Sequence, residues 1–238
     1  LALLAQTESA PEVRSQLASS AKRLSATHGL AIVRQLLARE EDLDDLHIPL
    51  LNWWAIESKT ESDRDDVLDL FREPAFWNLT MVRDAVLKRV MQRYAMAGGD
   101  ENFIMCAKLL KLAPGSDQTR LLMSGLQEAF LGRQITNVPE ELAQALSDYQ
   151  KTLGESDLAL ALRLGDQQAI DRAIRFVSDA KSDHAQRLQY IEILGQIKEP
   201  RIVKPLLNLL ARPADYSAKR IGMLALANYD DPVIGQTI

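Results

Sequence analysis

The sequence predicts an all-α chain made of stacked helical hairpins, and three observations support this prediction. First, a 32-residue echo near the C-terminus reads in each copy as helix, turn, helix. Second, nearly every segment has the apolar spacing of an α-helix, and none shows the sustained alternation of a strand. Third, prolines and glycines fall mostly between these segments. A fixed period of this size is typical of arrays in which each hairpin buries its apolar face against the next.

The echo relates similar residues that lie 32 positions apart. Asp183 returns as Asp215 at an expected helix start, where an aspartate can cap free backbone N–H groups. Arg187 and Lys219 each follow four residues later, a spacing that allows an acid–base pair in the first turn. The other equivalent pairs are Leu194 with Leu226, Gly195 with Ala227, Pro200 with Pro232, and Ile202 with Ile234.

The N-terminal helices are expected to be unequal in length. Pro11 suits the first turn of a helix over 11–24, which is followed by a helix over 28–38 and an acidic connector over 40–45. A dense apolar helix over 48–57 comes next, and then a helix over 62–71 that Pro74 ends. The longest helix is expected over 78–96, with a glycine C-cap at 98–99 and Asp100 as the N-cap of the next helix.

Helices over 101–112 and 118–130 complete the first part, and the aperiodic stretch 132–139 is the best candidate for a boundary. The sequence therefore predicts an irregular helical-repeat region over 1–132 and a more regular one over 133–238. Both ends read as parts of helices, so we expect a piece of a longer protein whose repeats continue past the C-terminus. The C-terminal helices are expected over 139–153, 157–164, 167–177, 184–197, 201–211 and 216–228.

Charge and composition exclude several classes of function. The net charge of −5 argues against a nucleic-acid binder, and no apolar run reaches the roughly 18 residues of a membrane helix. Residues 39–73 carry a local charge of −8 and residues 163–220 a local charge of +4. These are either solvated helix faces or the two ends of a polarised array that steers a protein partner. Cys106 is the only cysteine, so we expect a buried structural thiol and no disulfide, no metal site built on a cysteine pair and no covalently attached haem. Because no motif for either is present, we expect no cofactor and no metal.

Trp53 and Trp54 are the most conspicuous candidates for contact with a partner. Adjacent residues on a helix point about 100° apart, so one ring is expected to be buried. The other either packs against a neighbouring helix or serves as an exposed anchor for a protein or sugar partner. His47 stands at the entrance of the same helix and is expected to be a hydrogen-bonded structural residue, with partner contact as the alternative.

Arg201, Lys204 and Lys219 are the candidate contact residues at the basic end. The alternative is a solvated face whose charges pair between repeats. The carboxylates in 40–45 have the composition of a calcium loop but lack its glycine at the sixth position and glutamate at the twelfth. They are therefore expected to form a solvated connector. No pattern of catalytic, cofactor-binding or metal-binding residues is present.

Two resemblances to known families follow from particular stretches. Residues 198–211 and 215–226 resemble the first and second helices of a HEAT repeat. Residues 45–57 resemble a block from the helical middle region of putative membrane-bound dehydrogenases of planctomycetes and related bacteria. That resemblance implies a bacterial multidomain protein of the periplasm or cell envelope, with a sugar-dehydrogenase-like propeller before the helical region and a haem-binding cytochrome c domain after it. This chain has no Cys-x-x-Cys-His, so any such chemistry lies outside it.

These observations predict a non-catalytic scaffold or protein-interaction domain within a larger protein. The alternative is the helical part of a dehydrogenase or electron-transfer enzyme whose catalytic and haem domains lie outside this segment. A deep pocket with convergent polar groups would favour that alternative, whereas a smooth face would favour the scaffold. A helical array that binds DNA is a third option, which the net charge disfavours.

Overall fold

A computed structural model shows the chain to be all-helical, and no strand occurs among the residues it describes. These are residues 1–131, 135, 138–153, 158–211 and 215–237, with side chains at all of them except 150, 152, 153 and 237. The predicted all-α class is confirmed.

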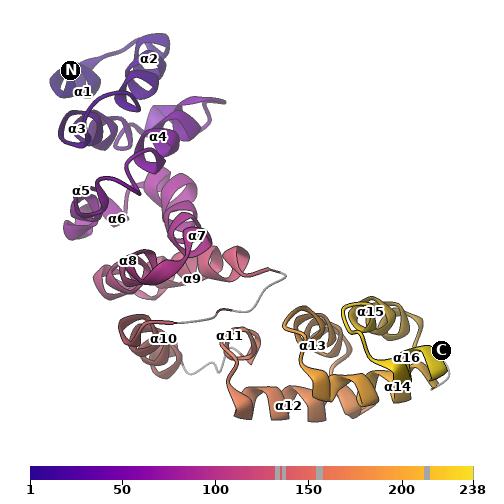
Figure 1. Cartoon of the computed structure of the whole chain (residues 1–238). Helices are drawn as coiled ribbons and strands as arrows, with labels where there is room; N and C mark the ends of the chain where they lie inside the picture. Colours follow the sequence, from indigo (N-terminus) through magenta and orange to yellow (C-terminus); the bar gives the residue numbers. More distant parts are fainter. Residues whose placement is uncertain (132–134, 136–137, 154–157, 212–214, 238) are drawn as a thin grey trace. The chain divides into compact units, whose positions relative to one another are not determined.

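The chain divides into two compact units (Figure 1). Unit 1 comprises Leu1–Ala129 and Asn137–Leu153, and unit 2 comprises Phe130–Thr136 and Gly154–Ile238. The boundary expected between residues 132 and 133 lies outside the described residues. Arg163 ties residues near 130 to unit 2, because its Nη1 donates to the Phe130 carbonyl at 2.6 Å and its own carbonyl accepts from Ile135 N–H at 2.9 Å.

Unit 1 packs its helices in a series in which most helices touch a near neighbour in the chain. α2 contacts α3 and α4, α7 contacts α8 and α9, and α8 contacts α10. The helices are α1 Ala2–Thr7, α2 Pro11–Ala21, α3 Ala26–Leu36, α4 Ile48–Glu57, α5 Arg64–Asp69, α6 Pro74–Trp77, α7 Lys88–Ala97, α8 Gly99–Leu112, α9 Ser116–Ala129 and α10 Glu140–Leu153. Short 3-10 helices cover Glu40–Asp42 (η1) and Leu70–Arg72 (η2), and a π-helix, η3, covers Val82–Leu87.

Two details of unit 1 differ from the predicted elements. The helix expected over 78–96 is interrupted, because η3 is wound as a π-helix before α7 begins at Lys88. Gly98 ends α7 with a φ of 65°, as expected of a glycine C-cap, but it also occupies the N-cap position of α8, so Asp100 lies inside the first turn. Asp100 was therefore wrongly predicted to be the cap.

The helix α10 also differs from prediction, because it was expected to open the C-terminal array and instead belongs to unit 1. Its buried side chains are Leu142, Ala145 and Leu146, which lie on one face of the helix. That face packs against α8. An amphipathic helix does not encode which of two apolar surfaces it will cover, so tertiary packing decides its place.

Gly125 marks a close approach between two helices of unit 1. A Cβ at this position would lie 2.1 Å from the carbonyl oxygen of Lys88, at the start of α7. The backbones of α9 and α7 can touch here only because residue 125 has no side chain.

Unit 2 places its helices in two rows. One row is α11 Leu158–Arg163, α13 His184–Gln196 and α15 Tyr216–Leu226, with contacts from α11 to α13 and from α13 to α15. The other row is α12 Gln167–Ser178, α14 Val203–Ala211 and α16 Pro232–Thr237, with contacts from α12 to α14 and from α14 to α16. A 3-10 turn, η4 Pro200–Ile202, leads into α14. The core between the rows includes Ile191, Leu194, Ile202 and Leu206, each fully buried.

The predicted aspartate caps of unit 2 are confirmed. The Asp183 carboxylate accepts from Gln186 N–H at 2.9 Å, and that of Asp215 accepts from Ala218 N–H at 3.0 Å. The charged pair takes a different form from the one expected, because Arg187 pairs with Asp215 of the next helix in the row. One carboxylate therefore caps α15 and also holds α13 against it.

Candidate functional site

The two tryptophans of α4 have opposite environments. Trp53 is 6% exposed and packs into unit 1, whereas Trp54 is 45% exposed. The pair therefore contains one buried ring and one ring that faces solvent, and Trp54 is the candidate anchor.

Trp54 belongs to a row of exposed apolar side chains. Leu50 lies four residues before it and is 36% exposed, and Leu46 lies four residues before Leu50 and is 79% exposed. Residues four apart on a helix share a face, so Leu50 and Trp54 lie on one side of α4. Exposed Leu46 lies in the bend just before α4 begins. We call Leu46, Leu50 and Trp54 the Trp54 face. Exposed tryptophan and leucine side chains in one row are typical of a surface that binds another protein.

Polar contacts at both ends of α4 fix the Trp54 face in place. At the N-terminal end the Asp45 carboxylate accepts from the N–H groups of His47 and Ile48, both at 2.8 Å. At the C-terminal end the ammonium of Lys59, a buried residue, donates to the carbonyl of Lys22 at 2.8 Å, just past the end of α2. Because both ends are held, the face is presented by a rigid element.

The Asp45 carboxylate makes the stability of unit 1 depend on pH. The hydrogen bonds from Ile48 and His47 lower the pKa of the Asp45 carboxyl below its ordinary value. The unfolded chain therefore binds the proton more tightly, and the cap stabilises the fold fully above the ordinary aspartate pKa of about 3.9. This stabilisation is lost as the pH falls through the lowered pKa of the folded state.

We expect Asp45→Ala to lower the free energy of unfolding by about 1 kcal/mol at pH 7, as removal of a capping side chain commonly does. The difference from the wild type should shrink as the pH falls below the ordinary aspartate pKa of about 3.9 and the carboxylate becomes protonated. Urea unfolding followed by tryptophan fluorescence at pH 7, 4 and 2.5 measures it. A difference that stays constant over this range would show that the carboxylate charge has no part in capping α4.

The acidic connector before α4 is only partly solvated, which corrects the prediction. Asp42 is 1% exposed, and both its oxygens are held by the guanidinium of Arg14. Glu41 pairs with Arg39 at 2.7 Å. Glu40 and Asp44 are exposed and form no ion pair with any described residue. An uncompensated negative charge thus stands beside Leu46.

His47 is exposed at the same end of α4, and its backbone N–H bonds to Asp45. His47, Trp54 and the missed residues Leu46 and Leu50 are thus all exposed, on α4 or within two residues of its start. The four-residue spacing from Leu46 to Trp54 could have identified this row in the sequence.

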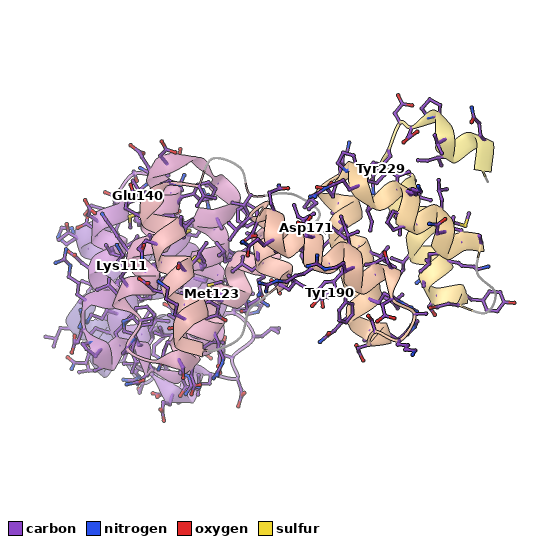
Figure 2. The ribbon with its side chains drawn as sticks, turned by 90° about the horizontal axis from the view of Figure 1, so that it is seen from below. Lys111, Met123, Glu140, Asp171, Tyr190 and Tyr229 are labelled. Atoms are coloured by element: carbon purple, nitrogen blue, oxygen red, sulfur yellow. The ribbon has the colours of Figure 1, made fainter. Side chains whose placement is uncertain are left out.

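The three basic candidates of unit 2 differ in their exposure and in whether they pair with an acid. Arg201 is already engaged, because it contacts Glu199 at 2.7 Å and Asp171, labelled in Figure 2, at 2.8 Å. These contacts raise the pKa of Arg201 and lower that of Glu199. Lys204 is exposed on α14, and Lys219 is half-buried on α15; neither pairs with a described acid.

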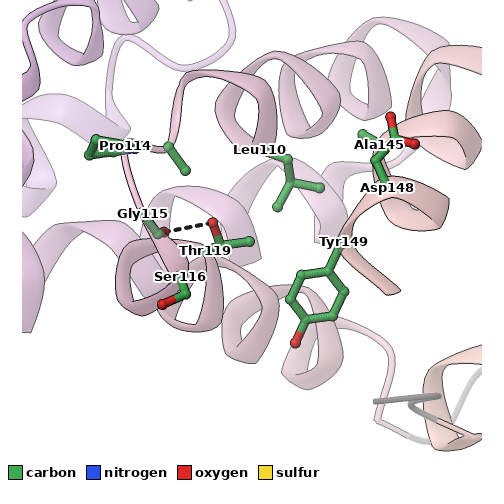
Figure 3. A pocket seen from close by; sticks show the side chains of 9 residues that line it. Leu110, Pro114, Gly115, Ser116, Thr119, Ala145, Asp148 and Tyr149 are labelled. Atoms are coloured by element: carbon green, nitrogen blue, oxygen red, sulfur yellow. Dashed lines mark hydrogen bonds between the residues drawn. The ribbon is translucent and has the colours of Figure 1, made fainter. Parts of the chain in front are cut away.

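A pocket of about 260 Å³ lies in unit 1 between the α8–α9 turn and α10 (Figure 3). Leu110, Pro114 and Ala145 give it apolar walls, and Tyr149 stands at its side. Its hydroxyl groups include that of Thr119, which donates to the Gly115 carbonyl at 2.9 Å. The lining also includes the carboxylate of Asp148 and the hydroxyl of Ser116, so the pocket combines apolar walls with a few polar groups.

Cys106 is fully buried on α8, which confirms the predicted structural thiol. Burial raises the pKa of Cys106 to about 12. Burial also raises the pKa of Tyr94, whose hydroxyl has no hydrogen-bond partner in the structure. Both groups stay neutral at physiological pH.

Comparison with known proteins does not indicate a function for this chain. The chain matches no protein-family model, no curated protein and no solved structure. Among the described helices, none is long and apolar enough to cross a membrane. Within that same part of the chain, no three acidic, histidine or cysteine side chains gather in a way that could hold a metal ion. The resemblances to HEAT repeats and to the dehydrogenase helical region stay predictions.

Proposed function

We propose that this chain is a non-catalytic protein-binding scaffold, and that the Trp54 face is the surface that binds. The observation that carries this proposal is the exposed pair Leu50 and Trp54 on one side of α4, a helix held at both ends, with exposed Leu46 in the bend before it. A large aromatic ring that is half exposed beside two leucines loses apolar contact with water when a partner covers it.

We further propose that the helices form an α-solenoid of HEAT-like hairpins. The two rows of unit 2 support this, since each row joins helices from successive hairpins. The link between Arg187 and Asp215 supports it too, because it connects equivalent helices of neighbouring repeats. Such arrays present extended surfaces rather than deep pockets, which suits a scaffold.

The charge beside the Trp54 face indicates what kind of partner it takes. Glu40 and Asp44 bring unpaired negative charge next to Leu46, in a stretch with a local charge of −8. A protein segment with apolar side chains followed by lysine or arginine would satisfy both features. Opposite charges at the rim mainly speed association and exclude wrong partners, while the buried apolar anchor supplies affinity.

We expect Trp54→Ala to weaken partner binding at least about tenfold, since a central tryptophan of an interface commonly contributes 2 kcal/mol or more. The free energy of unfolding should change by less than about 1 kcal/mol, because the ring is half exposed. A partner captured from cell extract would be purified and its dissociation constant measured by titration calorimetry. Met96→Ala, which removes an exposed apolar side chain on α7, is the matched control.

A second variant separates the role of charge from that of the ring. Asp44→Lys should slow association and reduce its dependence on salt, with little change in the dissociation rate. If Trp54→Ala and Met96→Ala bind the partner equally well, the Trp54 face is not the binding surface.

A further inference from the structure

A groove of about 240 Å³ lies between α3 and α5, inside unit 1. Each of these helices also contacts a helix on its other side, because α1 packs on α3 and α8 packs on α5 (Figure 1). Helices of this chain thus flank the groove on both sides. Its lining residues are Ala26, Thr27, Leu30, Ala31 and Arg34 of α3, Asp66 and Asp69 of α5, and Leu70 of η2.

The floor of the groove is aliphatic. Leu30 and Leu70 are 5% and 4% exposed, so they close the groove towards the core of unit 1. Ala31 is exposed, and its short side chain leaves room that a longer one would fill. No aromatic residue is among those that line the groove. The groove therefore offers a narrow surface that suits a chain of methylene groups.

One carboxylate at the rim of the groove has no counter-charge. Arg34 pairs with Glu73, and Asp69 pairs with Arg72 at 2.6 Å, so these charges are compensated. Asp66 is exposed and forms no ion pair with any described residue. The groove thus combines an aliphatic floor with a single uncompensated negative charge.

We propose that this groove binds a lysine side chain of a partner protein, with its methylene groups over the floor and its ammonium beside Asp66. Lysine commonly buries its methylene stem along apolar surface and keeps its charge at the rim. Arginine gains most where it can also stack on an aromatic ring, and none lines the groove. The surrounding residues 39–73 carry a local charge of −8, so their field attracts a cation and repels an anion.

The size of the groove favours a protein over a free small molecule as the source of this lysine. Pockets that enclose a whole small ligand commonly measure about 300–1,000 Å³, so this smaller groove holds one side chain. The rest of the partner then lies outside the groove, along the helices of unit 1. This site goes beyond the proposed function, because it does not include the Trp54 face.

The probe for this site is the peptide acetyl-Gly-Lys-Gly-amide, added to the full chain labelled for NMR. The amide signals of Thr27, Ala31 and Leu70 should shift and saturate, with a dissociation constant of about 1–10 mM. An analogue with norleucine in place of lysine keeps the methylene groups and lacks the ammonium. It should bind at least about threefold more weakly, because the contact with Asp66 is lost.

Two adjacent aspartates of α5 separate this contact from general attraction by the acidic region. Asp66→Asn should weaken binding of the lysine peptide about threefold to fivefold, the loss expected of one exposed ion pair. Asp65→Asn is the matched control, because it removes the same charge from the same turn of α5. Asp65 pairs with Lys108 at 3.5 Å and does not line the groove, so its replacement should leave binding unchanged.

A larger side chain at position 31 tests the floor of the groove. Ala31→Leu should weaken binding at least about tenfold, because its side chain takes the room of the methylene groups. Gln35→Leu is the matched control: it adds the same side chain to α3 outside the groove and should leave binding unchanged. Circular dichroism checks that each variant is folded.

Four results would overturn the proposal. The first is no saturable shift of these signals up to about 20 mM peptide. The second is an equal loss with Asp66→Asn and Asp65→Asn, which would leave only general attraction. The third is binding of the norleucine peptide as tight as that of the lysine peptide. The fourth is self-association of the chain without peptide that Asp66→Asn abolishes, since the groove would then take a second copy of this chain. Trp54→Ala should not alter peptide binding, so none of these results bears on the Trp54 face.

Discussion

Replacing Asp42 by alanine is expected to lower the free energy of unfolding of unit 1 by about 3–5 kcal/mol, because it leaves a buried guanidinium without its counter-charge. Arg14 Nε lies 2.6 Å from Asp42 Oδ2, and the two side chains are 4% and 2% exposed. The hydrogen bond to Asp42 raises the pKa of Arg14 in the wild type. The variant loses this bond, but Arg14 stays charged there because a guanidinium is not deprotonated in proteins. Its remaining hydrogen bonds, from Nη1 to the carbonyls of Glu8 at 3.1 Å and Ser9 at 2.7 Å, do not neutralise it.

Urea unfolding followed by tryptophan fluorescence measures this change selectively, because Trp53, Trp54 and Trp77 all lie in unit 1. The matched control is Glu73→Ala, which removes an exposed ion pair with Arg34 and should cost less than about 1 kcal/mol. The double variant Arg14→Met with Asp42→Leu should be clearly more stable than Asp42→Ala, since apolar residues of similar size can replace a buried ion pair. Equal losses for Asp42→Ala and Glu73→Ala would contradict the assignment of this pair.

Gly125→Ala is expected to destabilise unit 1 by about 2–3 kcal/mol, although alanine is the better helix former. The added Cβ would lie 2.1 Å from the carbonyl oxygen of Lys88 and 3.2 Å from the backbone nitrogen of Gln92. Both atoms belong to the backbone, so α7 itself must move away from α9. The contacts between these two helices would loosen along their length.

Gly115→Ala is the matched control within the same hairpin. Its Cβ would meet only the Oε1 of Gln118 at 3.2 Å, at the end of a flexible side chain. We therefore expect a change within about 0.5 kcal/mol. Chemical unfolding with the same fluorescence signal compares the two variants, and a Gly125→Ala protein as stable as the wild type would show that α7 and α9 are not packed backbone to backbone.

The sequence correctly predicted the features that depend on only a few adjacent residues. The helix class, the buried thiol of Cys106 and the caps Asp183 and Asp215 each depend on a few adjacent residues, and the structure confirms them. The choice between Trp53 and Trp54 was not predictable, because α4 is apolar nearly all the way round and its spacing selects no face. Packing of α2, α3 and α7 against α4 decides which ring is covered.

Contacts between residues far apart in the sequence could not be predicted from it either. Arg14 and Asp42 are 28 positions apart, so nothing in the acidic connector shows that one of its carboxylates is buried. The same holds for Arg187, whose partner Asp215 is 28 positions away while the expected partner Asp183 is four away. A four-residue spacing permits a pair, but a neighbouring helix can supply a better-placed carboxylate.

The buried thiol of Cys106 makes the folded chain chemically inert towards alkylating reagents. With a pKa of about 12, only about one thiol in ten thousand is a thiolate at pH 8. Labelling at neutral pH therefore requires that α8 first separate from its neighbours. Because Cys106 is the only cysteine, the rate at which it is modified in the native chain measures how often unit 1 opens around this one site.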